Sequence, residues 1–302
     1  MHATASESRA KVPAPRPDPA EADILRELSG RAMPAARAPQ EWEGIYRRLL
    51  RALLSATTYP DPARETGEMR GEKGSPPPRP PKMILEEIIV AAGAPGRESQ
   101  RGPLVRAMLA ELDTNDRLND RIYLLRQLAV VGRDEAVPAL ARLLSNPEPA
   151  LRHYALGALE ANTSAEAGKA LVAALKQQEE TPWFVAVIHA LGRRREKAAV
   201  GPLSQRLVGQ DGQIAEAAAM ALGSIATPEA ARALAAARTG APAVPAAVLG
   251  HARLLCADRM AAREEKEAAH AIYREVHEQA GDPLLKTAAQ SGMARVRPDK
   301  KP

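Results

Sequence analysis

The residues able to carry chemistry in this chain of 302 residues are few and far apart along the sequence. Among the six histidines, the nearest two are His270 and His277, which lie on one predicted helix. Seven residues of helix separate two side chains by about 10 Å along the axis, too far for both to ligate one metal ion. We therefore interpret the histidines as solvated or partly packed side chains and predict no metal site.

Sequence signatures of the commonest enzyme classes are also missing. G-x-S-x-G, Walker-type G-K-[ST], G-x-G-x-x-G and C-x-x-C do not occur, which removes the usual hydrolase, nucleotide, dinucleotide and zinc patterns. A single cysteine, Cys256, cannot form an intrachain disulfide, so a reducing cytoplasm is the expected location. No stretch approaches the roughly 18 consecutive apolar residues that a membrane-spanning helix requires. The sequence predicts a non-catalytic cytoplasmic protein without a cofactor.

Arginine clusters are the remaining candidates for contact with a partner. The run "GRRREK" is expected in a turn between helices, where Arg193, Arg194 and Arg195 would project from one edge and meet an acidic protein or a phosphate. A solvated loop is the favoured alternative for this run. Arg121 and Arg152 share one position of the repeat described below, so they could form a ladder. Bonds from these two arginines to neighbouring carbonyls or acids are the preferred interpretation.

Composition and charge limit the elements that can position these side chains. Aromatic residues make up only 3% of the chain, so a core has to be built from close-packed alanine and aliphatic side chains, which favours an all-α fold. The net charge of +5 lies at the ends: residues 1–82 carry 14 Lys/Arg against 11 Asp/Glu, and the segment from Arg295 carries four against one. The middle of the chain is close to neutral, which disfavours nucleic acid as a partner.

Two proline-rich stretches divide the N-terminal part of the chain. "KVPAPRPDPAEAD" and "GSPPPRPPK" cannot be helix interiors, because proline lacks a backbone N–H and fixes φ. We predict a disordered lead-in over residues 1–21, an amphipathic helical segment over 22–57 and a linker over 58–81. The "PPPRPP" run could also bind an SH3-like partner, although a linker is the preferred interpretation.

The 22–57 segment contains the clearest amphipathic helix. In "EWEGIYRRLLRALLS", Trp42 and six further apolar residues recur at helical spacing. Such a helix needs a partner surface, so it could fold back onto the first repeat, dock into another protein or lie on a membrane. The acidic residues Glu41 and Glu43 flank its start, so we favour the first two arrangements and predict no membrane partner.

Internal repetition is the strongest structural signal in the sequence. The triplets "QLA", "ALE", "ALG" and "ALG" recur at spacings of 31, 32 and 31 residues and begin at Gln127, Ala158, Ala190 and Ala221. A second landmark keeps the same three spacings, at Val137, Gly168, Val200 and Ala231. Asn, Thr or Asp caps before a first-turn proline or acidic residue, as in "NPEP" and "ETP", divide each unit into two helices. Each hairpin has apolar faces that it cannot bury alone, so the units are predicted to stack.

The units resemble HEAT repeats of the short, phycobilisome-lyase-type HEAT-like kind, within the armadillo-like helical repeats. The likeness rests on "AVPAL" with the "LL" that follows, on Leu151-Arg152 with the alanines after it, and on the two "ALG" triplets. The arginine of the pattern falls on Arg152 and Arg121 and is replaced by Phe184 and Ala215 in later units. The resemblance covers roughly residues 100–240.

This resemblance implies a right-handed α-solenoid of HEAT-like helical hairpins over residues 82–242. We predict that a divergent helical cap over 243–297 closes the solenoid, because the landmarks stop there, and that residues 298–302 form a tail. Within the cap, "ADRMAAREEKEAAHAIYREV" is more loosely similar to a tetratricopeptide hairpin, with Arg263 where a turn glycine is expected.

The resemblance implies a surface that binds proteins, so we predict a non-catalytic scaffold or adaptor that uses the concave face of its second helices. The alternatives are a phycobilin-lyase-like or chromophore-handling subunit and a nucleic-acid-binding HEAT-like protein. Deoxyhypusine hydroxylase shares this architecture but requires paired His-Glu motifs, and His277-Glu278 is the only such dipeptide. A HEAT-like DNA glycosylase would present an aromatic side chain from a basic groove, but Trp183 falls in the register of Leu151, a buried position. The identity of the partner and the oligomeric state stay open.

Overall fold

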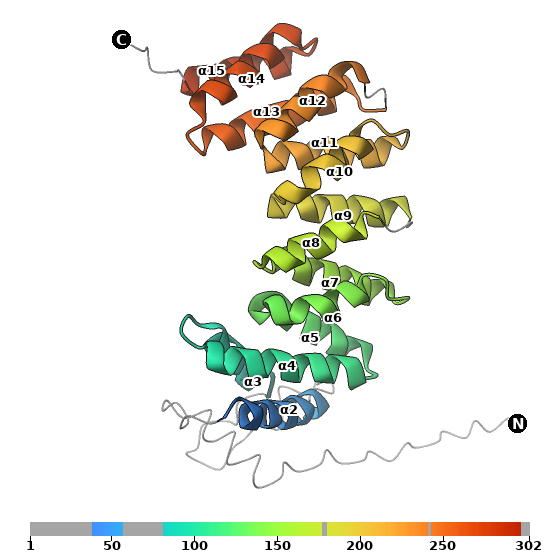
Figure 1. The fold of residues 1–302 in the computed structure, drawn as a ribbon, viewed down its shortest axis with the longest axis vertical. Helices are drawn as coiled ribbons and strands as arrows, with labels where there is room; N and C mark the ends of the chain where they lie inside the picture. Colours follow the sequence, from blue (N-terminus) through green and yellow to red (C-terminus); the bar gives the residue numbers. More distant parts are fainter. Residues whose placement is uncertain (1–37, 57–80, 177–179, 241–242, 297–302) are drawn as a thin grey trace, which may run out of the picture. The chain divides into compact units, whose positions relative to one another are not determined.

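A computed structural model describes residues 38–56, 81–176, 180–240 and 243–296, so the predicted lead-in, most of the linker and the tail lie outside the described residues. All regular structure in these ranges is helical, with fourteen α-helices and two short 3-10 helices (Figure 1). The predicted all-α fold class is confirmed, whereas the right-handed sense of the solenoid stays a prediction. None of the described helices is both long and apolar enough to cross a membrane.

The chain divides between Val131 and Gly132 into two compact units, a division that does not coincide with the boundaries predicted at residues 82 and 242. Unit 1 contains four described helices, α2 (Pro39–Ala56), α3 (Pro81–Gly93), α4 (Glu98–Thr114) and α5 (Leu118–Val131). Helix α2 packs against α4 and α3. Its apolar stripe is at most 4% exposed over Trp42, Ile45, Tyr46, Leu49, Leu50 and Leu54. Of the arrangements open to this helix, the fold-back onto its own chain is therefore the one observed.

Polar contacts also hold α2 against α4. Glu111, on α4, is only 4% exposed and accepts a hydrogen bond from Arg51 Nε at 2.7 Å. Arg47 Nε lies 3.8 Å from the same carboxylate oxygen, and Arg106 on α4 donates to Glu43 at 2.8 Å. Because a buried carboxylate needs compensating charge, the two arginines of α2 fix this helix on α4.

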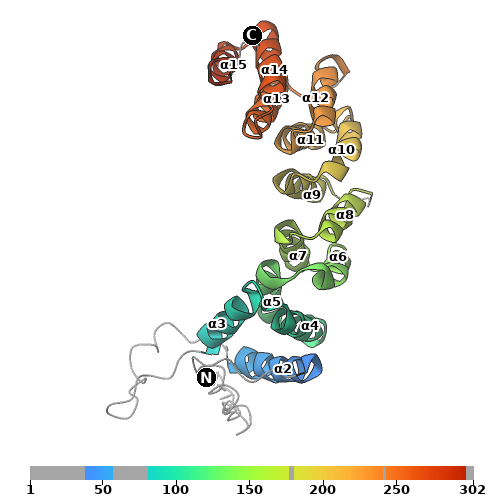
Figure 2. The same cartoon turned by 60° about the vertical axis from the view of Figure 1, so that its left-hand side comes forward.

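Unit 2 alternates between two rows of helices. The helices in chain order are α6 (Val137–Leu143), α7 (Pro149–Ala161), α8 (Ala165–Ala174), α9 (Thr181–Arg194), α10 (Val200–Leu207), α11 (Gly212–Ile225), α12 (Pro228–Gly240), α13 (Ala246–Ala261), α14 (Lys266–Gln279) and α15 (Pro283–Arg295). The 3-10 helices η1 (Asp134–Ala136) and η2 (Lys197–Ala199) precede α6 and α10. Figure 2 shows the first helices α6, α8, α10 and α12 in one row and the second helices α7, α9, α11 and α13 in the other.

The glycine of each "ALG" triplet lets two second helices approach closely. A Cβ on Gly192 would lie 2.9 Å from Ala221 Cα, and one on Gly223 would lie 2.5 Å from the carbonyl oxygen of Ala252. The same contact is therefore made twice, by α9 on α11 and by α11 on α13. Repeat packing thus continues into α13, past the residue where the sequence landmarks stop.

The helix caps agree with the predicted punctuation in part. Asp211 caps α11 by accepting from Ile214 N at 3.1 Å, and Thr227 Oγ1 accepts from Ala230 N at 3.1 Å. Helix α7 is capped by Glu148 instead of Asn146, whose side chain accepts from Glu148 N. Thr181 begins α9 and donates to Asp211 at 2.9 Å, so it links two neighbouring hairpins instead of capping its own helix.

Candidate functional site

The arginine run begins in the last turn of a helix and only its end lies in the turn that follows, which corrects the predicted placement for Arg193 and Arg194. Helix α9 continues through Arg194, and Arg195 follows as its C-cap with φ 55°. The guanidinium of Arg194 donates to the carbonyl oxygens of Leu159 at 2.9 Å, Ser164 at 2.9 Å and two residues between them. All but the Ser164 carbonyl lie at the C-terminal end of α7, where no intrahelical donor remains and the helix dipole attracts positive charge, and Ser164 is the N-cap of α8. The Arg194 side chain therefore stabilises the fold at the place where a projecting contact was predicted.

Arg193 and Arg195 differ in how far they are available to a partner. Arg193 donates from Nε and Nη2 to the two carboxylate oxygens of Glu160, the second bond measuring 2.6 Å. Hydrogen bonding to Glu160 raises the pKa of Arg193 above its ordinary value. Arg195 is exposed, and its backbone N donates to the carbonyl oxygen of Gly192 at 3.0 Å. Arg193 and Arg195 are thus both exposed, whereas Arg194 is half-buried.

Arginines serve the same capping purpose elsewhere in both units. In unit 1, Arg117 Nη2 donates to the carbonyl oxygen of Leu54, near the end of α2, at 2.5 Å. In unit 2, Arg206 donates to Leu175 at 3.1 Å and Arg263 donates to Ala226. These positions share no place in the 31-residue repeat, so the sequence landmarks gave no signal for them.

Arg121 and Arg152 lie in α5 and α7, which belong to different units, so their predicted ladder stays a prediction. Arg152 is half-buried, and its guanidinium carbon lies 5.3 Å from the centroid of the Trp183 ring. Arg121 is half-buried, and its Nε forms no hydrogen bond with any described residue. The contact of Arg152 with an aromatic face was not part of the sequence interpretation, and its predicted bonds to carbonyls or acids stay a prediction.

The structure places Trp183 differently from its expected buried position. Trp183 is half-buried beside α7, whereas its neighbour Phe184 is buried at 7% exposure and is contacted by Arg206. The prediction that Trp183 lies in the core was wrong, because the buried aromatic residue is the next one, Phe184. The ring of Phe184 is smaller, and an indole is seldom fully buried. Arg152 covers one face of the indole, so that face is not open for stacking on a base.

One repeat position forms an exposed column on the second helices of unit 2. It is the residue before each "ALE" or "ALG" triplet and its equivalent on α13, namely Gly157, His189, Met220 and His251. Three of the four are exposed and Met220 is half-buried. We call this column, together with His153 and Tyr154 beside Gly157, the second-helix face.

The side chains of the second-helix face are mainly imidazole and phenol rings and one thioether. Partial burial, followed by the nearby positive charge of Arg193, lowers the pKa of His189 below its ordinary value of 6.5. His153 and Tyr154 form an edge-to-face ring pair with centroids 6.0 Å apart. Aromatic, sulfur and imidazole groups on one surface suit contact with another polypeptide.

The remaining histidines and the cysteine have structural surroundings. His270 and His277 are half-buried on α14, and His277 Nδ1 lies 3.1 Å from the carbonyl oxygen of Lys286, which fits the partly packed interpretation. Within the described ranges, no three His, Cys, Asp or Glu side chains gather as a metal site would require. Burial raises the pKa of the Cys256 thiol to about 11. This thiol is protonated at neutral pH and is a poor nucleophile.

Stacked helical hairpins with glycine contacts at repeated positions define the class of this molecule, an all-helical repeat protein arranged like an α-solenoid in unit 2. No known protein family matches the chain, and no curated protein matches it in sequence. Among solved structures, human deoxyhypusine hydroxylase in complex with glycerol is similar at 17% identity, over 85% of this chain and 96% of that chain, with a TM-score of 0.29. A likeness this remote says nothing of the activity of this chain.

Proposed function

We propose that this protein is a non-catalytic scaffold that binds a protein partner through the second-helix face of unit 2. The observation that carries the proposal is the exposed position of Gly157. It lies inside α7, it is exposed, and no atom lies within 4 Å of where its Cβ would be. Glycine in a helix interior costs about 0.5–1 kcal/mol relative to alanine, and here packing within the chain does not require it.

The contrast with other glycines sharpens this argument. Gly192 and Gly223 lie where a neighbouring backbone leaves no room for a side chain. Gly157 also lacks a side chain, but the space beside it is open solvent, and His153 and Tyr154 lie one turn earlier. A partner segment that approaches α7 closely between these rings and His189 explains the glycine.

Electrostatics support a protein partner over the nucleic-acid alternative. Arg193 is paired with Glu160, and Arg194 is bonded to carbonyl groups of α7. Neither of these two arginines is therefore free to neutralise a phosphate, and contacts to phosphates supply most of the affinity of nucleic-acid-binding proteins. The chromophore-handling alternative predicts visible absorbance that purifies with the chain.

The experiment compares Gly157→Arg with a matched control, Gly201→Arg. Gly201 is also exposed, helical and free of neighbours within 4 Å, but it belongs to the first-helix row, on α10. Proteins from the native lysate that bind the full chain are identified and purified, and their Kd is measured for both variants. We expect Gly157→Arg to weaken binding at least about tenfold, equivalent to 1.4 kcal/mol, and Gly201→Arg to leave the Kd unchanged.

Four results would oppose the scaffold proposal. Equal affinity of the two variants, or a loss confined to Gly201→Arg, would move the interface off the second-helix face. Tight DNA binding that falls steeply with salt would favour the nucleic-acid alternative. A coloured small molecule retained by the purified chain would favour the chromophore-handling alternative.

A further inference from the structure

A buried charge replaces a leucine of the repeat near the C-terminal end of unit 2. The middle residue of each landmark triplet is a leucine with no exposed surface, at Leu128, Leu159, Leu191 and Leu222. Thirty-one residues after the last of these, on α13, the same position holds Arg253, which is only 6% exposed. The repeat therefore places a guanidinium where its pattern calls for an aliphatic core residue.

Two side chains of α14 contact this guanidinium. Arg253 Nη2 donates to Glu275 Oε2 at 2.5 Å, and Nη1 donates to Gln279 Oε1 at 3.0 Å. Burying a charge is expensive even when it is paired, and an aliphatic residue in its place is often neutral or stabilising. Packing of α13 against α14 would be satisfied by the leucine of the other repeats. The arginine therefore needs a reason beyond packing.

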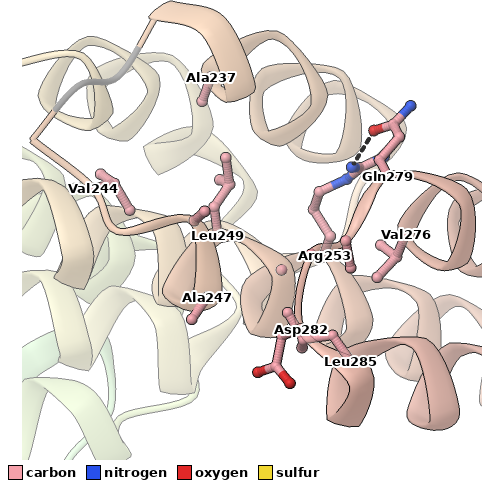
Figure 3. Close-up of a pocket in the computed structure, with 13 residues that line it drawn as sticks. Ala237, Val244, Ala247, Leu249, Arg253, Val276, Gln279, Asp282 and Leu285 are labelled. Carbon is pink, nitrogen blue, oxygen red and sulfur yellow. Dashed lines mark hydrogen bonds between the residues drawn. The ribbon is translucent and has the colours of Figure 1, made fainter.

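A cavity of about 230 Å³ lies beside Arg253, between α13, the end of α12 and the α14–α15 connection. Its walls are mainly apolar, from Val244, Leu249, Val276 and Leu285, and Figure 3 shows Arg253 and Gln279 together along one side. Asp282 lines the other side, where its carboxylate accepts from Leu284 N at 2.8 Å as the cap of α15. The two charged residues of the lining, Arg253 and Asp282, therefore lie on different sides of the cavity.

We propose that this cavity binds a small carboxylic acid with an apolar body. The carboxylate accepts hydrogen bonds from Arg253 in place of the neutral, exposed Gln279 side chain, and the apolar body contacts Leu249, Val276 and Leu285. A guanidinium is the side chain best suited to a planar carboxylate. The size fits, because cavities of about 150 Å³ hold a benzene ring in other proteins.

This inference is independent of the scaffold proposal, because the cavity lies at the α13–α15 end and shares no residue with the second-helix face. It is tested with the full chain and three probes of one shape: phenylacetate, the uncharged phenylacetamide and the cationic phenethylamine. Binding is followed through the methyl NMR signals of Val244, Leu249, Val276 and Leu285. We expect phenylacetate to shift these signals and to bind at least about tenfold more tightly than either analogue, as a charge-assisted hydrogen bond requires.

The decisive variant is Arg253→Leu, which restores the repeat residue. It is expected to keep its helical content and thermal midpoint, and to lose the preference for the carboxylate. Failure of phenylacetate to shift the cavity methyls at millimolar concentration overturns the proposal. Equal binding of phenylacetate by wild type and Arg253→Leu also overturns it. If Arg253→Leu does not fold, the wild-type comparison of the three probes decides, because equal affinities for all three exclude a carboxylate site.

Discussion

Arg193 and Glu160, 33 residues apart, join α9 to α7 through an ion pair in which both carboxylate oxygens accept. Glu160 occupies the repeat position of Gly192 and Gly223, where the next two second helices instead make close backbone contacts. Across the first step of the stack, this ion pair and the bonds from Arg194 to carbonyls at the end of α7 stand where the next two steps have glycine contacts. Because partly exposed ion pairs contribute little, most of the polar stabilisation of the α7–α9 step is expected to come from Arg194.

Replacing Arg194 by alanine tests whether the arginine run is structural. Loss of its bonds to the α7 carbonyls should lower the free energy of unfolding by about 2 kcal/mol, the usual contribution of hydrogen bonds to a charged group. Arg195→Ala is the matched control, and its effect should stay within about 0.5 kcal/mol. Urea denaturation followed by circular dichroism measures both, and equal losses would contradict the capping role of Arg194.

Alanine at Gly223 and at Gly157 should change stability in opposite directions. At Gly223 the new Cβ meets the Ala252 carbonyl oxygen, so we expect a loss of about 1–3 kcal/mol from overpacking. At Gly157 the new Cβ meets open space, so we expect a gain of about 0.5–1 kcal/mol from helix propensity. Thermal unfolding of the two variants measures the signs, and destabilisation by Gly157→Ala would show that this glycine is needed by the fold.

Periodicity predicted the parts of this molecule that depend on backbone spacing. Two landmarks, each recurring every 31 or 32 residues, predicted the order of the helices and their stacking, because apolar burial repeats with the backbone. An aspartate cap could also be predicted from the sequence, because a cap acts on its own helix. After residue 242 the sequence landmarks no longer recur. The backbone of Ala252 nevertheless makes the repeat contact with Gly223, because this contact requires only a small residue.

Long polar side chains were the part that periodicity could not predict. Arg194 reaches carbonyls 30 to 35 residues earlier, and no spacing rule distinguishes it from Arg195, which points to solvent. With two adjacent aromatics, Trp183 and Phe184, the choice of the buried ring depends on the space between helices, which sequence alone does not supply. The second helices were predicted to present a concave binding face, but the significance of Gly157 required knowing that nothing packs against it.

The contact of α2 with α4 should depend on the buried carboxylate of Glu111. Glu111→Ala removes the acceptor of Arg51 and the negative charge beside Arg47, so we expect a loss of about 1–3 kcal/mol and faster amide exchange over residues 39–56. Glu43→Ala removes a more exposed pair with Arg106 and should cost at most about 1 kcal/mol. Hydrogen exchange measured by mass spectrometry resolves α2 separately. Unchanged exchange of α2 in Glu111→Ala would show that Glu111 does not hold α2 on α4.

Alkaline pH should destabilise the fold, in part through Cys256. Burial raises the pKa of this thiol from 9.0 to about 11, so between these values the unfolded chain releases a proton that the folded chain keeps. The folded state then binds more protons, and its stability falls as pH rises from about 9 to about 11, by on the order of 2 kcal/mol for this group. Tyr46 and Tyr123, whose pKa values burial raises to about 12, act in the same direction at higher pH.

The variant Cys256→Ala measures how much the thiol contributes to the loss of stability at alkaline pH. The variant should be less stable than wild type at pH 8, because it loses buried volume, but its urea midpoint should fall less steeply between pH 9 and pH 11. In wild type, the thiol should react with iodoacetamide at pH 8 only when urea unfolds the chain, since the folded thiol is both buried and protonated. Parallel pH profiles for wild type and variant, or rapid labelling of the folded chain, would contradict the raised pKa of this buried thiol.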